Sequence, residues 1–218
     1  MKAIIFDMDG VIFDSERAML WSLQEVCKRK GIKDVTPFYN DCIGVTREKT
    51  VQIFQAVYGA DFDVEAFMQE GSEIYHERYD GGRMPIKEGA KEILSYLKEE
   101  GYLIALASST KRKSVERQLR DAGLLSYFPV LVCGDMVQRS KPAPDIFLCA
   151  AKELGVEPEE CFVIEDSYNG IRAAASAGMK AFMVPDMLPP NEEMDRLSYR
   201  IMTNLLEVKE YLIQKEEK

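Results

Sequence analysis

Five short apolar runs along the chain predict the strands of a parallel sheet. They cover residues 3–6, 102–107, 130–133, 161–164 and 181–184. Each run is continuously apolar instead of alternating with polar residues, which is typical of strands with helices packed on both faces. Between the runs, apolar residues recur at helical spacing, and Gly101, Gly123 and Gly155 stand where helices are expected to end. This alternation predicts a doubly wound, Rossmann-like α/β fold.

Residues 15–79 break this alternation. Apolar side chains form three successive helical stripes here, and the span contains no strand pattern. The stripes are Met19, Leu20, Leu23, Val26 and Cys27, then Val51, Phe54 and Val57, then Phe67 and Ile74. We therefore predict an all-helical insert after the first strand, joined back to the core by the glycine-containing linker 80–85. The expected domains are a core of residues 1–14 and 80–218 and a helical domain of residues 15–79.

Composition and charge limit the kinds of partner. The chain has 218 residues, of which 46% are hydrophobic, so it can form a sizeable core. Its net charge of −9 argues against binding nucleic acid or an anionic membrane, and no apolar run approaches the ~20 residues that span a bilayer. Five cysteines without a Cys-x-x-Cys pair are typical of reduced thiols, so we expect a cytoplasmic location.

Two aspartates directly follow the first predicted strand. Asp7 and Asp9 stand two residues apart, so their side chains point the same way in an extended chain. One carboxylate could attack phosphorus, while a second one nearby could protonate the leaving oxygen and later activate water. A solvated turn or a simple metal site would use the same residue types, and this segment alone leaves those alternatives open.

A second acidic pair, Glu165 and Asp166, follows the predicted strand 161–164. Together with Asp7 it would form a cluster of hard oxygen ligands, which suits Mg²⁺ better than zinc. The cation would also offset the repulsion between these carboxylates and a phosphate dianion. The alternative is helix capping by Asp166 or Ser167, which is compatible with metal binding.

Hydroxyl and ammonium groups follow two further strands. Ser108 and Ser109 stand between the strand 102–107 and a predicted helix, where hydroxyls and backbone N–H groups can bind a phosphoryl oxygen. Lys141 lies in a proline-stiffened loop and could bridge a phosphate and the acidic cluster. Read alone, these residues would be an ordinary helix cap and a surface lysine. All four segments follow strands, however, and parallel sheets bind ligands at that edge.

With these motifs in this order, the chain resembles the haloacid dehalogenase superfamily of phosphohydrolases with an aspartate nucleophile. The insert resembles the α-helical cap of one branch, and the resemblance covers essentially the whole chain. It implies that Mg²⁺ is the cofactor. The implied catalytic roles are Asp7 as nucleophile, Asp9 as general acid/base, Ser108 and Ser109 as phosphate contacts and Lys141 as charge stabiliser. The implied metal site consists of Asp7, the Asp9 carbonyl and Asp166, with Glu165 either a further ligand or a neighbour of the site.

Within the superfamily, the chain is similar to β-phosphoglucomutases and sugar-phosphate phosphatases. Residues 44–47 resemble the mutase segment whose arginine holds the distal phosphate, which makes Arg47 a candidate substrate contact. Met19 stands where the mutases carry a histidine, which argues against mutase activity. Dehalogenase and phosphonate-cleaving relatives lack an acid at the position of Asp9, so its presence favours phosphate esters. We expect His76, the single histidine, to be an ordinary cap residue.

The resemblance thus implies a Mg²⁺-dependent phosphatase of small phosphorylated metabolites, with sugar phosphates as the expected class, working as a monomer or weak dimer. A phosphomutase is the alternative enzyme. A non-enzymatic phospho-receiver module is the rival from another class. It is disfavoured because its phosphorylated aspartate follows a later strand and it has no helical insert of this length.

Overall fold

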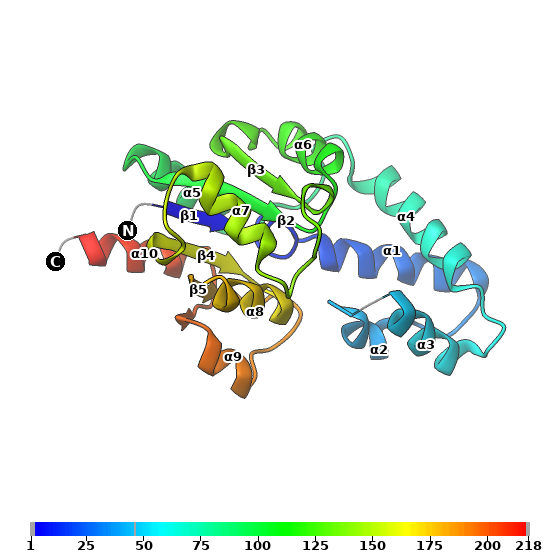
Figure 1. Cartoon of the computed structure of the whole chain (residues 1–218). Coiled ribbons are helices and arrows are strands. Elements are labelled where there is room, and N and C mark those ends of the chain that lie inside the picture. The colour runs from blue at the N-terminus through cyan, green and yellow to red at the C-terminus, as the bar shows by residue number, and fades with distance from the viewer. Residues whose placement is uncertain (1–2, 46, 217–218) are drawn as a thin grey trace.

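The protein has an α/β part built on one parallel sheet and a group of helices beside it (Figure 1). The computed structural model describes residues 3–45 and 47–216. The strands are β1 (Ala3–Phe6), β2 (Leu103–Ser108), β3 (Val130–Cys133), β4 (Cys161–Glu165), β5 (Lys180–Met183) and β6 (Arg200–Ile201). Their order in the sheet is β3-β2-β1-β4-β5-β6, and all pairs are parallel.

The sheet grows from β1 in two directions. The chain proceeds from β1 to β2 and β3 on one side, then crosses to β4 on the other side of β1. The register pairs Phe6, the last residue of β1, with Leu106 of β2 and with Ile164 of β4, so the ends of the three strands lie within two residues of one another. A crevice is expected between β1 and β4, where the direction of winding reverses.

Helices cover both faces of the sheet. Ile4 and Phe6 pack toward α5 (Ala90–Glu99), α6 (Arg112–Asp121) and α10 (Leu205–Glu216), whereas Ala3 and Ile5 pack toward α7 (Asp145–Leu154), α8 (Tyr168–Ser176) and α9 (Glu192–Leu197). All four side chains of β1 are fully buried. Burying one large apolar side chain contributes about 1.5–3 kcal/mol, so the central strand anchors the fold from both sides.

The predicted fold class is confirmed. Each of the five expected strands is present to within two residues, and helices separate them as the periodicity indicates. The sixth strand, β6, was not predicted, because two residues are too short to carry a pattern. None of the five cysteines forms a disulfide. Within the described residues, no helix combines the length and apolar character that crossing a membrane requires.

Residues 15–79 fold as helices, as predicted. They form α1 (Ser15–Lys30), α2 (Thr36–Tyr39), a 3₁₀ turn (Asn40–Cys42), α3 (Arg47–Tyr58) and α4 (Val64–Tyr79). Helices α1 and α4 pack side by side (Figure 1). A separate apolar cluster that includes Leu23, Phe54 and Phe67 holds this unit together. The cluster supports the domain boundaries expected from the sequence, which stay a prediction. We call this unit the cap and the remainder the core.

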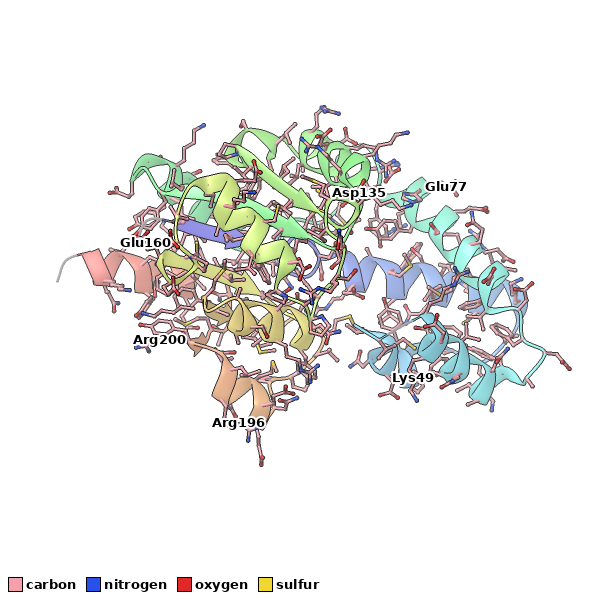
Figure 2. The ribbon with its side chains drawn as sticks, viewed as in Figure 1. Lys49, Glu77, Asp135, Glu160, Arg196 and Arg200 are labelled. Atoms are coloured by element: carbon pink, nitrogen blue, oxygen red, sulfur yellow. The ribbon has the colours of Figure 1, made fainter. Side chains whose placement is uncertain are left out.

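Polar contacts tie the cap to the core. Asn169 Nδ2 donates to the Gly44 carbonyl at 2.7 Å, and Arg117 of α6 pairs at 2.5 Å with Asp80, the first residue after the cap. The fully buried carboxylate of Asp186 pairs with Arg17 of α1 and with Lys87 beyond the cap. Charged side chains stand on the outer surface of both parts, for example Lys49 and Glu77 on the cap and Asp135, Glu160, Arg196 and Arg200 on the core (Figure 2).

Candidate active site

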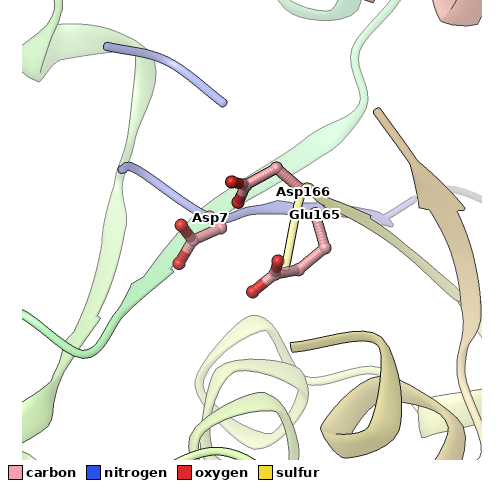
Figure 3. A group of neighbouring side chains, drawn as sticks. All are labelled: Asp7, Glu165 and Asp166. Carbon is pink, nitrogen blue, oxygen red and sulfur yellow. The ribbon is translucent and has the colours of Figure 1, made fainter. Parts of the chain in front are cut away.

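Three carboxylates meet where β1 and β4 end. Because Phe6 pairs with Ile164, Asp7 stands level with Glu165, and the Asp7 N–H donates to the Ile164 carbonyl at 2.9 Å. Asp166 follows directly. Oxygen atoms of Asp7, Glu165 and Asp166 all lie within 4.8 Å of one another, and all three residues are buried (Figure 3). The topology therefore assembles the acidic cluster that the sequence predicts.

Two glycines make room for this cluster. Gly10 adopts φ +78°, and a Cβ built there would lie 2.3 Å from Asp166 Oδ2. A Cβ on Gly170, in the first turn of α8, would lie 1.6 Å from Glu165 Oε1. A side chain at either position would displace a carboxylate. Sequence reasoning missed Gly170, although glycine is unfavourable inside helices and its presence there was a usable signal.

Lys141 bridges the carboxylates. Its Nζ donates to Asp7 Oδ1 at 2.5 Å, to Glu165 Oε1 at 2.9 Å and to the Ala107 carbonyl at 3.0 Å. Its side chain is only 7% exposed. Burial alone would lower the pKa of Lys141, but the charges of Asp7 and Glu165 outweigh burial and raise it. Lys141 is therefore a permanent cation inside the site.

The single positive charge of Lys141 does not neutralise the charges of three buried carboxylates. Burial raises the pKa of Asp7 to about 8; Lys141 opposes this shift, and Glu165 and Asp9 add to it. Burial, followed by the charges of Glu165 and Asp7, raises the pKa of Asp166 well above its ordinary value. Buried carboxylates require a charge partner, and a bound cation would provide one. The donor set of carboxylate oxygens fits a hard cation.

Glu165 is the most fully engaged of the three acids. Its Oε1 accepts from Lys141, while its Oε2 accepts from the Ser167 N–H at 2.7 Å and from the Ser167 hydroxyl at 3.0 Å. The Ser167 hydroxyl also accepts from the Gly170 N–H at 3.1 Å, so Ser167 caps α8 as the sequence suggested. Hydrogen bonds from Lys141 and Ser167 therefore occupy both carboxylate oxygens of Glu165.

The Asp9 side chain is held apart from the acidic cluster by hydroxyl groups. Its Oδ1 accepts from Ser15 at 2.9 Å, and its Oδ2 accepts from Thr110 at 2.9 Å and from Ser108 at 3.5 Å. Ser108 is fully buried and accepts from the Thr110 N–H. Sequence reasoning missed both Ser15 and Thr110 as partners of Asp9. Both residues stand next to a predicted motif, Ser15 at the start of α1 and Thr110 directly after Ser109. This proximity in the sequence could have identified them as partners of Asp9.

A cavity of about 410 Å³ opens over these groups. Its core wall includes Ser109 and Gln118 besides the acids and Lys141. The cap covers the other side, so the active site would lie between the two parts. The cap residues that line the cavity are Ser15, Glu16, Met19, Ile43, Gly44, Ser72, Tyr75 and His76. Met19 thus lines the cavity in addition to packing in the cap cluster, and His76 lies closer to the chemistry than we expected.

Comparison with known proteins agrees with this geometry. A family model described as haloacid dehalogenase-like hydrolase matches residues 4–184. The chain belongs to this family. The resemblance expected from the motifs is therefore confirmed, and the match includes every candidate site residue named so far.

Relatives in the family include a phosphatase and a mutase. The phosphorylated carbohydrates phosphatase of Thermotoga maritima is 32% identical over 182 residues, 83% of each chain. The crystal structure of a β-phosphoglucomutase from Clostridium difficile has a TM-score of 0.74 at 26% identity, covering 99% of this chain and 96% of that one. SUPPRESSOR OF QUENCHING 1 of Arabidopsis thaliana is 36% identical over 86% of this chain, which spans only 18% of that protein. The chain is thus a phosphatase- or phosphomutase-like member of the family.

Arg47 is not brought to the cavity. It stands at the start of α3 and pairs with Glu65 of α4, and both side chains are exposed. Arg47 lines a separate groove between α3 and α4, together with Thr50 and Met68. Its neighbour in the predicted segment, Thr46, lies outside the described residues. A substrate contact by Arg47 stays a prediction.

Proposed function

We propose that the protein is a Mg²⁺-dependent phosphatase that hydrolyses phosphate monoesters of small metabolites, with sugar phosphates as the substrate class. The observation that carries the proposal is the bridging of Asp7 and Glu165 by buried Lys141, with Asp9 held separately at hydrogen-bond distance from hydroxyls. This arrangement supports attack by Asp7 and proton transfer by Asp9. The family and its phosphatase relative support the same reaction.

In the proposed reaction, an oxygen of Asp7 attacks phosphorus in line, and the bond between phosphorus and the ester oxygen breaks. Protonated Asp9 gives its proton to the departing alkoxide, which leaves as an alcohol. The carboxylate of Asp9 then removes a proton from water, which attacks the phosphorus of the aspartyl-phosphate. Inorganic phosphate leaves, and Asp7 and protonated Asp9 are regenerated. Both steps therefore use the same pair of aspartates.

Charge on the transferred phosphoryl group needs fixed partners. Lys141 supplies a buried cation beside Asp7, and Ser109 supplies a hydroxyl group at the core wall of the cavity, whereas the Ser108 and Thr110 hydroxyls donate to Asp9. Fixed charges and dipoles at the transferring group carry much of the catalysis in phosphoryl transfer. Closure of the cap over a bound substrate would exclude bulk water and strengthen these interactions.

The carboxylates suit Mg²⁺, whose proposed ligands are Asp7, Asp166 and the Asp9 carbonyl. When bound, the cation would neutralise the repulsion between the acids and the phosphate dianion. Because both oxygens of Glu165 already accept hydrogen bonds, we place Glu165 next to the coordination sphere, where it positions Lys141. The sequence predicted Glu165 either as a metal ligand or as a neighbour of the metal site, and we propose the second role.

A phosphomutase is the second candidate, favoured by the fold shared with β-phosphoglucomutase. It would pass the phosphoryl group from Asp7 back to a sugar phosphate instead of to water. Met19 lines the cavity at the position of the mutase histidine, and Arg47 lies elsewhere, so water is the better supported acceptor. A receiver module fits poorly, because its phosphorylated aspartate would not follow the first strand.

Phosphorus NMR separates the two enzymes. The protein is incubated with Mg²⁺ and β-glucose 1-phosphate, primed with glucose 1,6-bisphosphate, and inorganic phosphate and glucose 6-phosphate are followed together. We expect phosphate release to outrun isomerisation. Faster isomerisation would show that the protein is a mutase and that Met19 in place of the mutase histidine does not prevent this activity.

A further inference from the structure

Among the residues that the structure describes, the cap wall of the cavity contributes no lysine or arginine to pair with a second anion. It presents Glu16, Met19, Ile43, Ser72, Tyr75 and His76. Among the described residues that line the cavity, Lys141 is the sole lysine or arginine, and it is already engaged by Asp7 and Glu165. A phosphate or carboxylate at the cap end of a substrate would therefore lose its hydration without gaining an ion pair, which is costly.

Glu16 adds a repulsive element to this wall. It lies in the first turn of α1, and its Oε2 accepts from the Tyr39 hydroxyl at 3.0 Å, which fixes the carboxyl group in place. Burial raises the pKa of Glu16, and the hydrogen bond from Tyr39 opposes that shift. A fixed acid at this place discriminates against anionic groups and accepts hydrogen bonds from hydroxyls.

Gln118 offers an unused hydrogen-bonding group on the opposite wall. It lies on α6, outside the four sequence motifs, and lines the cavity. Its buried Oε1 has no hydrogen-bond partner among the described residues. A substrate hydroxyl can donate a hydrogen bond to this unpaired oxygen. An unpaired buried polar group gains most from a ligand that satisfies it.

His76 and Ser72 face the same cavity from the cap. They stand four residues apart on α4 and therefore share one helix face. His76 Nδ1 is hydrogen-bonded to Asp80 Oδ1 at 3.1 Å, which leaves Nε2 for a ligand. Together with Gln118 these groups form a set of hydrogen-bonding partners around a cavity of about 410 Å³, at the small end of the usual range for ligand pockets.

Building on the proposed phosphatase function, we propose that the cavity selects monophosphates of small, neutral polyhydroxy compounds. Gln118 and His76 bind substrate hydroxyls, and Glu16 excludes substrates that carry a second anionic group. Selectivity thus comes from residues outside the catalytic motifs.

A substrate panel on the unmodified protein tests the proposal. Initial rates with Mg²⁺ are measured for glucose 6-phosphate, glucose 1,6-bisphosphate and phenyl phosphate, which has no hydroxyl groups. We expect kcat/KM for glucose 6-phosphate to exceed that for the bisphosphate by at least about 10-fold, and that for phenyl phosphate by a smaller factor. Equal or faster turnover of the bisphosphate would overturn the proposal.

The same substrate panel distinguishes an error in the proposed selectivity from an error in the proposed phosphatase function. If none of the esters releases phosphate, the phosphatase function is wrong and the substrate class falls with it. If phenyl phosphate and the bisphosphate are hydrolysed at least as well as the sugar monophosphate, the phosphatase function stands and the selectivity is wrong.

Two variants test whether Gln118 contributes to substrate selectivity. Gln118→Met should raise KM for glucose 6-phosphate by about 2- to 10-fold and change KM for phenyl phosphate by less, because only the sugar loses a hydrogen bond. Gln52→Met, on the exposed side of α3, is the matched control and should leave both values unchanged. An equal change for both substrates would indicate a structural role for Gln118 and contradict the proposal.

Glu16→Gln keeps an acceptor for the Tyr39 hydroxyl while removing the charge. We expect it to reduce the preference for glucose 6-phosphate over glucose 1,6-bisphosphate by about 3- to 10-fold, mainly through KM of the bisphosphate. An unchanged preference would mean that Glu16 does not face the substrate. Thermal melting of each variant verifies that it is folded.

Discussion

The two walls of the cavity differ in charge and in origin. On the core wall, Asp7 and Glu165 pair with Lys141 and Asp166 lies beside them, and each comes from the end of a strand or the loop after one. The cap wall consists mainly of uncharged side chains such as Met19, Ile43, Ser72 and Tyr75, with Glu16 as its acid and His76 as its titratable base. The difference suggests a division of labour. Changes to the core wall should act on kcat, and changes to the cap wall should act on KM and on the choice of substrate.

The largest expected effect is that of Asp7→Asn. It keeps the size of the side chain but removes the nucleophilic carboxylate, so turnover should fall to background in a phosphate-release assay. Asp61→Asn, at an exposed position of the cap, is the matched control and should retain the full rate. Near-normal turnover of Asp7→Asn would contradict the mechanism.

Asp9→Asn should have the next largest effect. Its hydrogen bonds with Ser15 and Thr110 can persist, whereas proton transfer is lost, so kcat should fall by roughly 10²–10⁴-fold with little change in substrate binding. A substrate with a better leaving group, such as 4-nitrophenyl phosphate, needs less protonation and should lose less. An equal loss for good and poor leaving groups would argue against Asp9 as the general acid.

Removal of Mg²⁺ should alter stability in a pH-dependent way. The raised pKa values of Asp7 and Asp166 mean that the folded, metal-free protein retains protons that the unfolded chain releases near pH 4. Stability from these groups is therefore complete below about pH 4 and is lost as the pH rises toward the folded-state pKa of Asp7, about 8. A bound cation replaces these protons, so its stabilising effect should be larger at pH 8 than at pH 5.5.

Thermal melting with Mg²⁺ or EDTA at both pH values measures this effect. At a 100-fold excess over Kd, Mg²⁺ should raise Tm by about 5–10 °C at pH 8. Activity should disappear with EDTA while the fold persists, because a core of this size does not depend on metal. An equal shift at the two pH values would show that the cation binds away from Asp7 and Asp166.

The smallest expected effect is that of Arg47→Ala. Its ion pair with Glu65 is exposed on both sides, so its loss should cost less than about 0.5 kcal/mol. KM for sugar monophosphates should stay the same. A higher KM confined to bisphosphates would instead indicate that Arg47 contacts the substrate. The cap wall would then carry a cation as well.

The core wall could be predicted from the sequence for a physical reason. Its residues follow apolar runs directly, and the carboxyl ends of parallel strands share one edge, so order along the chain implies proximity in space. The cap wall could not be predicted in this way. Which faces of α1 and α4 meet the cavity depends on how the helices pack, and neither His76 nor Gln118 belongs to a local pattern. The contacts of Asp9 with Ser15 and Thr110 likewise depend on side-chain directions that spacing alone does not specify.

The central position of β1 also bears on how the protein is made. Ala3 pairs with Leu103 and with Cys161, about 160 positions later. At ≈5–20 residues per second, a ribosome needs about 8–30 s to supply the second neighbour of a strand that is entirely apolar. The cap, whose apolar cluster is built mainly from its own residues, can fold during this interval, whereas β1 keeps at least one edge unpaired until β4 is made. Newly made chains therefore pass through a stage with a finished cap and no catalytic centre, when they depend most on protection from aggregation.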